Sequence, residues 1–337
     1  MQFAGPARVL DAPGMLDDVA LNVLDWSARD ILAVALEGTV YLWQDGQANE
    51  LLSLPQAAEY VSALGWIHDG TCLAVSCSNG SVQIWDAVKG KKLRTLVGNN
   101  EIAAGRIGAL AWNRHLLSTG DQSGRILTHD VRVAKHLVQD HGAVHRDEVC
   151  ALKWSPDGRF LASGSLDSKI GIFAKLDHAP VLLNGHSGST RALAWCPWQP
   201  GLLLSGCTGG DLKLWDVLQA STVSSTRDPA GILNVQWSKT HRQFLTTHSS
   251  PDNSVKLWKY PRMDLLTSYP QAHSARVLQM ALSPDGRTMV TAAADECIKF
   301  WPLPTTSAVG LPGVPLAPRI MQTRAKLIAR KSPFTKK

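Results

Sequence analysis

The chain has 337 residues, of which 45% are hydrophobic and 18% are charged. This composition excludes a coiled coil, a disordered protein, a collagen and a secreted disulfide scaffold, and no apolar stretch reaches the roughly 20 residues of a membrane-spanning helix. Of the formal net charge of +6, seven positive charges and no negative ones fall in residues 319–337, so residues 1–318 carry about −1. A neutral body does not favour nucleic acid as a partner.

The first regular feature along the chain is a short segment that ends in tryptophan and recurs every 40 to 46 residues. Its alternating small and apolar residues are typical of a buried β-strand. The copies are Asn22–Trp26, Ala63–Trp66, Ala109–Trp112, Ala151–Trp154, Ala192–Trp195, Asn234–Trp237 and a degenerate seventh, Gln279–Leu282.

A second segment, most often ending in an aromatic residue, recurs every 42 to 44 residues. A strand of small residues, such as Leu161–Ser165, lies between the two series, and Ser155–Gly158 and Ser283–Gly286 are turn sequences that join them. The copies are Tyr41–Trp43, Gln83–Trp85, Leu127–His129, Gly171–Phe173, Lys213–Trp215, Lys256–Trp258 and Lys299–Trp301.

Seven copies of about 43 residues, each with several short strands, predict an all-β fold, the seven-bladed WD-repeat β-propeller. Two β-sandwiches would have no reason to keep either register. Pro302 and Pro304 follow the last copy, so the seventh blade lacks an outer strand there. We expect the N-terminal Ala7–Leu10 to complete it, giving a propeller over residues 7–304 closed by an N-terminal strand. Residues 305–337 are expected to form a short, basic, disordered C-terminal tail.

His273, Thr291 and Asp295 are the residue types of a hydroxyl–imidazole–carboxylate triad. With Trp301 they also match a structural tetrad, because the same offsets recur at His145 and at His186. We favour the structural interpretation and expect no enzyme activity, no catalytic residues and no cofactor. The six cysteines show no zinc-ligand spacing, so no metal is expected, and without a signal peptide they are expected to be reduced.

Three segments are more specific than the general repeat: Leu10–Pro13, Ala194–Gln199 and Trp258–Pro261. With them, the chain closely resembles the fizzy family, the cell division cycle protein 20 type activators of the anaphase-promoting complex, over about residues 7–303. The resemblance implies a non-enzymatic subunit that binds degron peptides on its propeller and presents substrates to this ubiquitin ligase. The partners it implies are the complex itself and degron-bearing proteins.

The resemblance also implies two degron sites. Asp18 and Glu296 match the acids that face the arginine of a destruction box, although Val19 and Ala20 stand where the family has two bulky residues. The alternative is that both acids are ordinary exposed turn residues. The residues that match a KEN-type site, several of them altered, are Asp25, Arg276, Leu166, Ser168 and Asp252; Arg276 could instead be an ordinary rim arginine.

The leading hypothesis is therefore an activator-like, substrate-recognition subunit, a monomeric propeller in cytoplasm and nucleus that binds neither nucleic acid nor membranes. The alternative is a WD-repeat interaction scaffold that no longer engages the ligase. It arises because the sequence shows neither the docking box expected ahead of the propeller nor a final Ile-Arg, and ends in Lys336 and Lys337.

Overall fold

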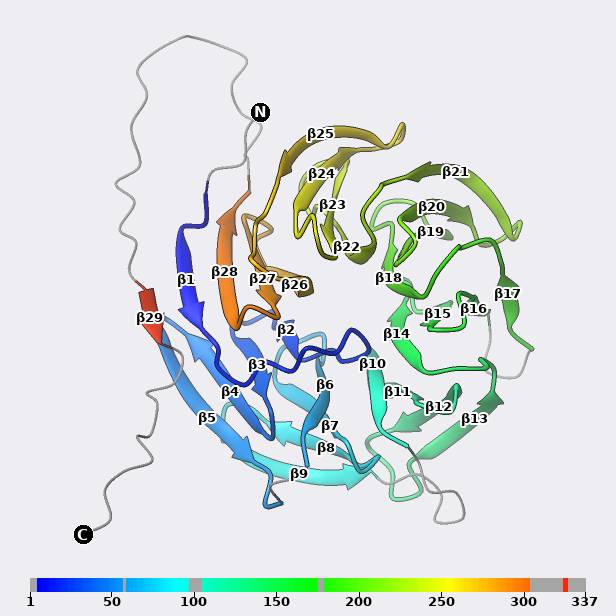
Figure 1. Ribbon diagram of the computed structural model, residues 1–337. Coiled ribbons are helices and arrows are strands. Elements are labelled where there is room, and N and C mark those ends of the chain that lie inside the picture. Colours follow the sequence, from blue (N-terminus) through cyan, green and yellow to red (C-terminus); the bar gives the residue numbers. More distant parts are fainter. Residues whose placement is uncertain (1–4, 57–58, 97–104, 175–178, 304–323, 327–337) are drawn as a thin grey trace.

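The computed structural model describes residues 5–56, 59–96, 105–174, 179–303 and 324–326. Its regular elements are all β-strands, arranged as seven sheets around a central axis (Figure 1). The all-β, seven-bladed propeller predicted from the two repeats is confirmed. Within the described residues there is no helix that is long and apolar enough to cross a membrane.

Blades 1 to 6 each contain four antiparallel strands in chain order, from the inner strand at the axis to the outer strand at the rim. Blades 1 to 3 contain β2 (Leu24–Trp26), β3 (Leu32–Leu36), β4 (Thr39–Gln44), β5 (Gln47–Ser53), β6 (Val61–Trp66), β7 (Cys72–Cys77), β8 (Val82–Asp86), β9 (Lys91–Leu96), β10 (Ile107–Asn113), β11 (Leu116–Asp121), β12 (Arg125–Asp130) and β13 (Leu137–Ala143). Blades 4 to 6 contain β14 (Val149–Trp154), β15 (Leu161–Ser165), β16 (Ile170–Phe173), β17 (Val181–Leu183), β18 (Thr190–Trp195), β19 (Leu202–Cys207), β20 (Asp211–Asp216), β21 (Ser221–Arg227), β22 (Ile232–Trp237), β23 (Gln243–His248), β24 (Val255–Lys259) and β25 (Asp264–Tyr269).

Blade 7 joins the two ends of the propeller. Its three C-terminal strands are β26 (Val277–Leu282), β27 (Thr288–Ala293) and β28 (Cys297–Pro302), and the N-terminal β1 (Arg8–Asp11) pairs antiparallel with β28. The hydrogen bonds continue past the strand, from Ala12 N to the Glu296 carbonyl at 2.7 Å. The predicted closure by an N-terminal strand is therefore confirmed, and its physical reason is the otherwise unpaired edge of β28.

The tail departs from its prediction at the one place where the structure describes it. β29 (Arg324–Lys326) pairs parallel with β1 and adds a fifth strand to blade 7. The outer edge of β1 offers unpaired backbone groups, which a following segment of chain satisfies by adding a strand. The rest of the predicted disordered tail, 305–323 and 327–337, lies outside the described residues.

The tryptophans that end the first repeated segment join neighbouring blades through their indole N–H groups. This contact explains why they recur with the blades. In four of them the donor reaches a backbone carbonyl of the preceding inner strand, so each repeat is tied to the one before it. These bonds run from Trp66 to Asp25 at 3.2 Å, from Trp112 to Gly65 at 2.9 Å, from Trp195 to Lys153 at 2.8 Å and from Trp237 to Ala194 at 3.1 Å.

A buried arginine bridges the propeller near its axis. Arg191, on the inner strand of blade 5, is 5% exposed and donates to the carbonyls of Leu233, Leu278 and Leu21, which belong to blade 6, blade 7 and the approach to blade 1. Burial lowers its pKa to about 10. On the other side of the axis, Asn22 donates to carbonyls of blades 3 and 4 at 2.7 and 2.9 Å. Polar side chains therefore link blades that are far apart in sequence.

Candidate degron-binding face

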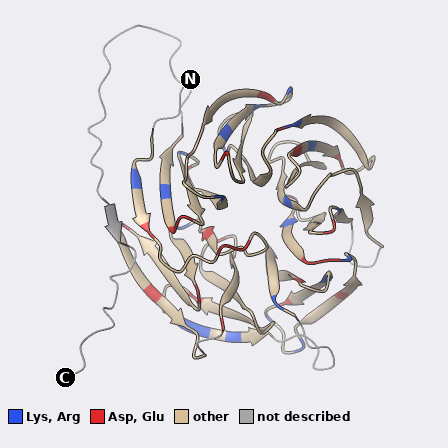
Figure 2. Ribbon diagram, in the orientation of Figure 1, with Lys and Arg blue, Asp and Glu red and all other residues tan. Residues whose placement is uncertain are grey.

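The chain between β1 and β2 crosses one face of the disc, and we call residues 12–22 the crossing segment (Figure 1). Figure 2 shows acidic residues on this segment. The same face carries the residue immediately before each inner strand. In four blades the residue at that position is Tyr60, Arg106, Glu148 or Arg276. We call this face of the disc the crossing face.

Asp18 is held in an ionic chain rather than left free. Its Oδ2 accepts a hydrogen bond from Arg106 Nη1 at 2.6 Å, and its Oδ1 accepts one from Ala20 N at 2.8 Å. Arg106 also forms a fork with Glu148, with both distances 2.8 Å. These bonds, those with Glu148 above all, raise the pKa of Arg106 above its usual range. The Asp18 side chain is 34% exposed, so it is oriented by the protein and still reachable from solvent.

Glu296 is the more open of the two predicted destruction-box acids. It lies on the turn between β27 and β28 with a positive φ of 57°, and its Oε1 accepts the Gly14 N–H at 3.1 Å. Both acids therefore contact the crossing segment, Asp18 from within it and Glu296 from blade 7. Within the described part of the chain no hydrogen bond joins the two carboxylates, so they are two separate acids, one within the crossing segment and one beside it.

The apolar wall beside Asp18 is thin, as the sequence predicted from Val19 and Ala20. Ala20 is buried at 2% exposure and offers no surface to a ligand. Val19 is partly buried and packs on the core cluster together with Leu16 and Tyr60. Any apolar slot for a peptide at this point therefore depends on Val19 and these two neighbours.

Four of the five residues predicted for a KEN-type site lie on the crossing face. Arg276 donates to the carboxylate of Asp17 and, at 3.0 Å, to the Asp17 carbonyl. Leu166 and Ser168 lie on the turn between β15 and β16, and Ser168 has a φ of 68°. Asp252, on the turn between β23 and β24, is paired with Lys256 at 2.9 Å. Arg276 and Asp252 thus already have partners of opposite charge.

Asp25 does not join them, and this part of the prediction needs correction. It stands one residue before Trp26, level with Ala281 on β26, which is five residues beyond Arg276, or roughly 16 Å along the strand. Its carboxylate accepts the N–H groups of Trp66 at 2.7 Å and Trp26 at 2.9 Å, and burial raises its pKa. Asp25 therefore ties blade 1 to blade 2 at the opposite end of the inner strands.

Comparison with known proteins gives the family. Residues 10–301 match the family model described as "CDC20/Fizzy WD40 domain". The chain belongs to this family. The resemblance inferred from Leu10–Pro13, Ala194–Gln199 and Trp258–Pro261 is confirmed.

Similar curated proteins cover most of this CDC20/Fizzy chain. It is 40% identical to "Cell division cycle 20.5, cofactor of APC complex" of Arabidopsis thaliana, with 87% of this chain and 67% of that protein covered. It is 39% identical to "Anaphase-promoting complex subunit cdc20" of Dictyostelium discoideum, with 88% and 60% covered. It thus spans about 60–67% of the length of these relatives. A chain in the structure "Crystal Structure of Mitotic Checkpoint Complex" superimposes with a TM-score of 0.84 at 40% identity, covering 88% of this chain and 94% of that one.

In this CDC20/Fizzy propeller the residues of the apparent triad form a buried hydrogen-bond chain. Trp301 Nε1 donates to Thr291 Oγ1 at 2.8 Å, His273 Nε2 lies 2.8 Å from the same oxygen, and His273 Nδ1 lies 3.0 Å from Asp295. Thr291 is fully buried. Burial lowers the pKa of His273. A hydroxyl that no substrate can reach, and that already accepts an indole N–H, is placed for support of the blade.

Blade 6 contains a related chain that the sequence analysis missed. Trp258 Nε1 donates to Thr246 Oγ1 at 2.8 Å, and the same oxygen lies 2.8 Å from His248 Nε2. The hydroxyl is twelve residues before the tryptophan here and ten in blade 7, so a search at fixed offsets does not find it. In blade 4, His145 contacts Asp167 and Ser163 as expected, while Phe173 replaces the indole donor.

The sequence analysis also missed the ionic partners on the crossing face, namely Arg106, Glu148 and Asp17. A signal for two of them was present, because Arg106 and Glu148 share the position just before the inner strand with Arg276. In a propeller all such positions meet around one opening, so charges there are neighbours despite being 42 residues apart or more. Asp17 had no comparable signal, because the path of the crossing segment follows no repeat.

Proposed function

We propose that this propeller is a non-enzymatic, activator-like subunit of the anaphase-promoting complex that binds destruction-box peptides on its crossing face. The observation that carries the proposal is membership of the CDC20/Fizzy family, whose relatives include proteins described as a cofactor or a subunit of that complex. The ligase and degron-bearing proteins are the partners in this proposal, and the working form is a monomer in nucleus and cytoplasm. Six free cysteines fit those reducing compartments.

The charges on the crossing face suit a basic peptide. Five carboxylates lie on or beside the crossing segment, against three guanidinium groups. The carboxylates belong to Asp17, Asp18, Glu37, Glu148 and Glu296, and the guanidinium groups to Arg106, Arg191 and Arg276. The formal excess is two negative charges. A degron arginine would add the missing positive charge, and carboxylates bind guanidinium groups through paired, charge-assisted hydrogen bonds.

Asp18 and Glu296 differ in how they would serve this arginine. A carboxylate has about four acceptor positions, and Asp18 uses one for Arg106 and one for Ala20 N. It is therefore pre-oriented but must share its charge with Arg106. Glu296 gives one acceptor to Gly14 N and keeps more of its capacity. We assign the larger part of arginine binding to Glu296.

An affinity purification of the tagged chain from dividing cells tests the proposal. We expect ligase subunits to co-purify together with degron-bearing proteins. A Glu296→Gln variant should lose the degron-bearing proteins, whereas Glu50→Gln, at an exposed acid on the outer strand of blade 1, should not. Recovery of degron-bearing proteins without any ligase subunit would contradict the proposal and support the interaction scaffold instead.

A further inference from the structure

Blade 5 has lost the acid of its structural tetrad. Gly209 stands where blades 4 and 7 have Asp167 and Asp295, which lie 3.1 and 3.0 Å from the Nδ1 atoms of their histidines. In blade 5, His186 Nε2 still lies 2.6 Å from Ser205 Oγ. Its Nδ1 atom is buried and has no hydrogen-bond partner among the described residues.

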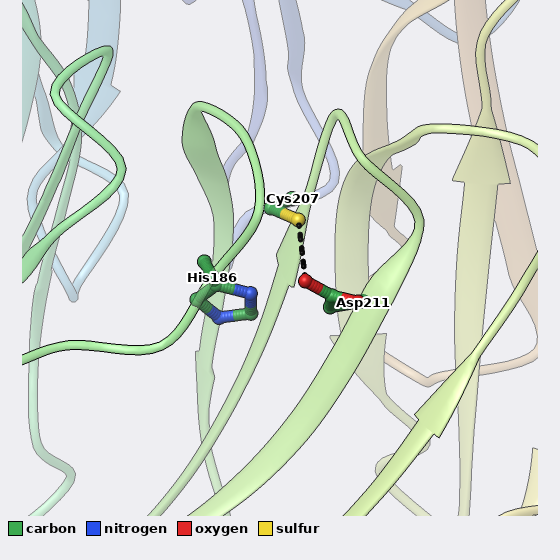
Figure 3. A group of neighbouring side chains, drawn as sticks. All are labelled: His186, Cys207 and Asp211. Carbon is green, nitrogen blue, oxygen red and sulfur yellow. Dashed lines mark hydrogen bonds between the residues drawn. The ribbon is translucent and has the colours of Figure 1, made fainter.

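Two other side chains that could bind a metal ion lie close to this nitrogen, those of Cys207 and Asp211. Glycines let the two loops approach, since a Cβ at Gly209 would lie 2.2 Å from Ser187 Oγ. Cys207 ends β19 and Asp211 begins β20, and the Cys207 Sγ and Asp211 Oδ2 atoms are 3.6 Å apart. Figure 3 shows the imidazole, the thiol and the carboxylate grouped at this end of the blade. The three donor atoms all lie within 4.8 Å of one another.

We propose that His186, Cys207 and Asp211 form a binding site for a divalent transition metal of the zinc class. Nitrogen, sulfur and carboxylate oxygen are zinc's usual donors, at about 2.0, 2.3 and 2.0 Å. Tetrahedral angles at those lengths place sulfur and oxygen roughly 3.5 Å apart, close to the 3.6 Å in the structure. A water molecule is the fourth ligand. Binding releases the thiol proton of Cys207 to solvent and forms the metal–sulfur bond.

The hydrogen bonds around the site suit this role. Metal binding at Nδ1 requires the proton on Nε2, which then donates to Ser205 Oγ. That oxygen also accepts Trp215 Nε1–H at 2.7 Å, and its own proton goes to the Lys213 carbonyl at 3.5 Å. Ser187 N donates to Asp211 Oδ2 at 2.8 Å and orients the carboxylate. Such outer partners fix the orientation of metal ligands. The Asp211 side chain is 15% exposed, which leaves a path for the ion.

A second group of possible metal ligands, in blade 6, is not proposed as a metal site. Asp228, His248 and Asp252 also lie within ligand distance of one another. The Lys256 ammonium already contacts both carboxylates, at 2.7 Å and 2.9 Å, and supplies the positive charge there. Among the described residues, Asp211 has no such close lysine or arginine: Arg227 lies 3.9 Å from it and is 70% exposed. Lys213 is near enough for its charge to help lower the pKa of His186, but it forms no ion pair with Asp211.

The test is a titration of the purified full chain, stripped with a chelator, with Co²⁺ alone. We expect one equivalent to bind with the absorption of tetrahedral cobalt and a sulfur-to-cobalt charge-transfer band, and Zn²⁺ to displace it. Cys207→Ser should abolish that band. Loss of a residue that only hydrogen-bonds to a metal ligand lowers metal affinity by about 10–100-fold. Asp211→Asn changes a ligand itself and should weaken Co²⁺ binding by at least that much. The matched control is Cys77→Ser, because Cys77 ends β7 of blade 2 as Cys207 ends β19; it should leave the titration unchanged.

A second variant keeps the proposal falsifiable if Cys207→Ser does not fold. In Ser187→Gly/Gly209→Asp the restored acid should take the His186 Nδ1–H, as in blades 4 and 7, so that the blade stays folded but does not bind Co²⁺. Thermal unfolding of each variant checks the fold. No stoichiometric binding by the wild-type chain, or an unchanged band in Cys207→Ser or in the double variant, would overturn the assignment.

Discussion

Replacing Arg191 by methionine tests whether polar bridges near the axis stabilise the propeller. The guanidinium makes three hydrogen bonds to carbonyls of other blades, and bonds to charged groups contribute about 1.5–3 kcal/mol each. Against this, burial lowers its pKa from 12.5 to about 10, which corresponds to about 3 kcal/mol of unfavourable desolvation. The Leu278 and Leu21 carbonyls also accept from Asn234 and Gln279, so they keep a partner in the variant.

Three such bonds give about 4.5–9 kcal/mol, and subtracting the desolvation leaves an expected loss of about 1.5–6 kcal/mol in the free energy of unfolding of Arg191→Met. Urea unfolding followed by tryptophan fluorescence measures it. Arg159→Met is the control, because Arg159 is 61% exposed, and its surface ion pair with Asp157 and its contact with the Phe160 ring are each worth at most about 1 kcal/mol. A variant as stable as the wild type, or more stable, would show that the buried cation does not stabilise the propeller.

Three further predictions concern closure of the ring by β1, the dependence of stability on pH, and the role of Asp25. Deletion of residues 1–11 should expose the edge of β28 and cause aggregation; a deletion variant that elutes as a normally melting monomer would contradict this. Burial lowers the pKa values of His129, His186 and His248 to about 4. Their contribution to stability is therefore complete above pH 6.5 and is lost as the pH falls toward 4, by up to about 1.4 kcal/mol per pH unit for each histidine. Thermal melting between pH 7 and 4.5 should show the loss, and a flat profile would count against it. Asp25→Asn should lower the melting temperature but leave peptide binding intact, which calorimetry and a peptide titration check; weaker binding at unchanged stability would return Asp25 to the degron site.

The sequence predicted the fold well because two independent registers repeat through all seven blades. It even predicted the closing strand, since Pro302 and Pro304 leave β28 without a neighbour. The strand at Arg324–Lys326 was missed because the Pro/Gly-rich, basic composition around it gives no strand signal, and its pairing depends on the exposed edge of β1. Propensity is a weak guide where a free edge supplies the hydrogen bonds.

The candidate site was predicted less well. Matching a residue to a family position does not show at which end of an inner strand the residue lies. Asp25 lies near the end of the inner strand β2, whereas Arg276 immediately precedes the start of the inner strand β26. The ion pairs of Arg106 with Asp18 and Glu148 join residues 88 and 42 positions apart. Only the ring arrangement of the blades brings them together. The loss of the tetrad acid at Gly209 was visible in the sequence, but its consequence required the three-dimensional positions of Cys207 and Asp211.

The most direct test of the central claim is a fluorescence titration of the purified propeller with labelled destruction-box and KEN peptides. We predict weak but measurable destruction-box binding and almost no KEN binding, because Leu166 offers no polar partner and Arg276 is already paired with Asp17. Glu296→Gln should weaken the destruction-box complex by about 10- to 150-fold, the equivalent of one charge-assisted contact of about 1.5–3 kcal/mol. Tighter binding of the KEN peptide, or destruction-box binding unchanged in an Asp18→Asn/Glu296→Gln variant, would show that Asp18 and Glu296 do not form the destruction-box site.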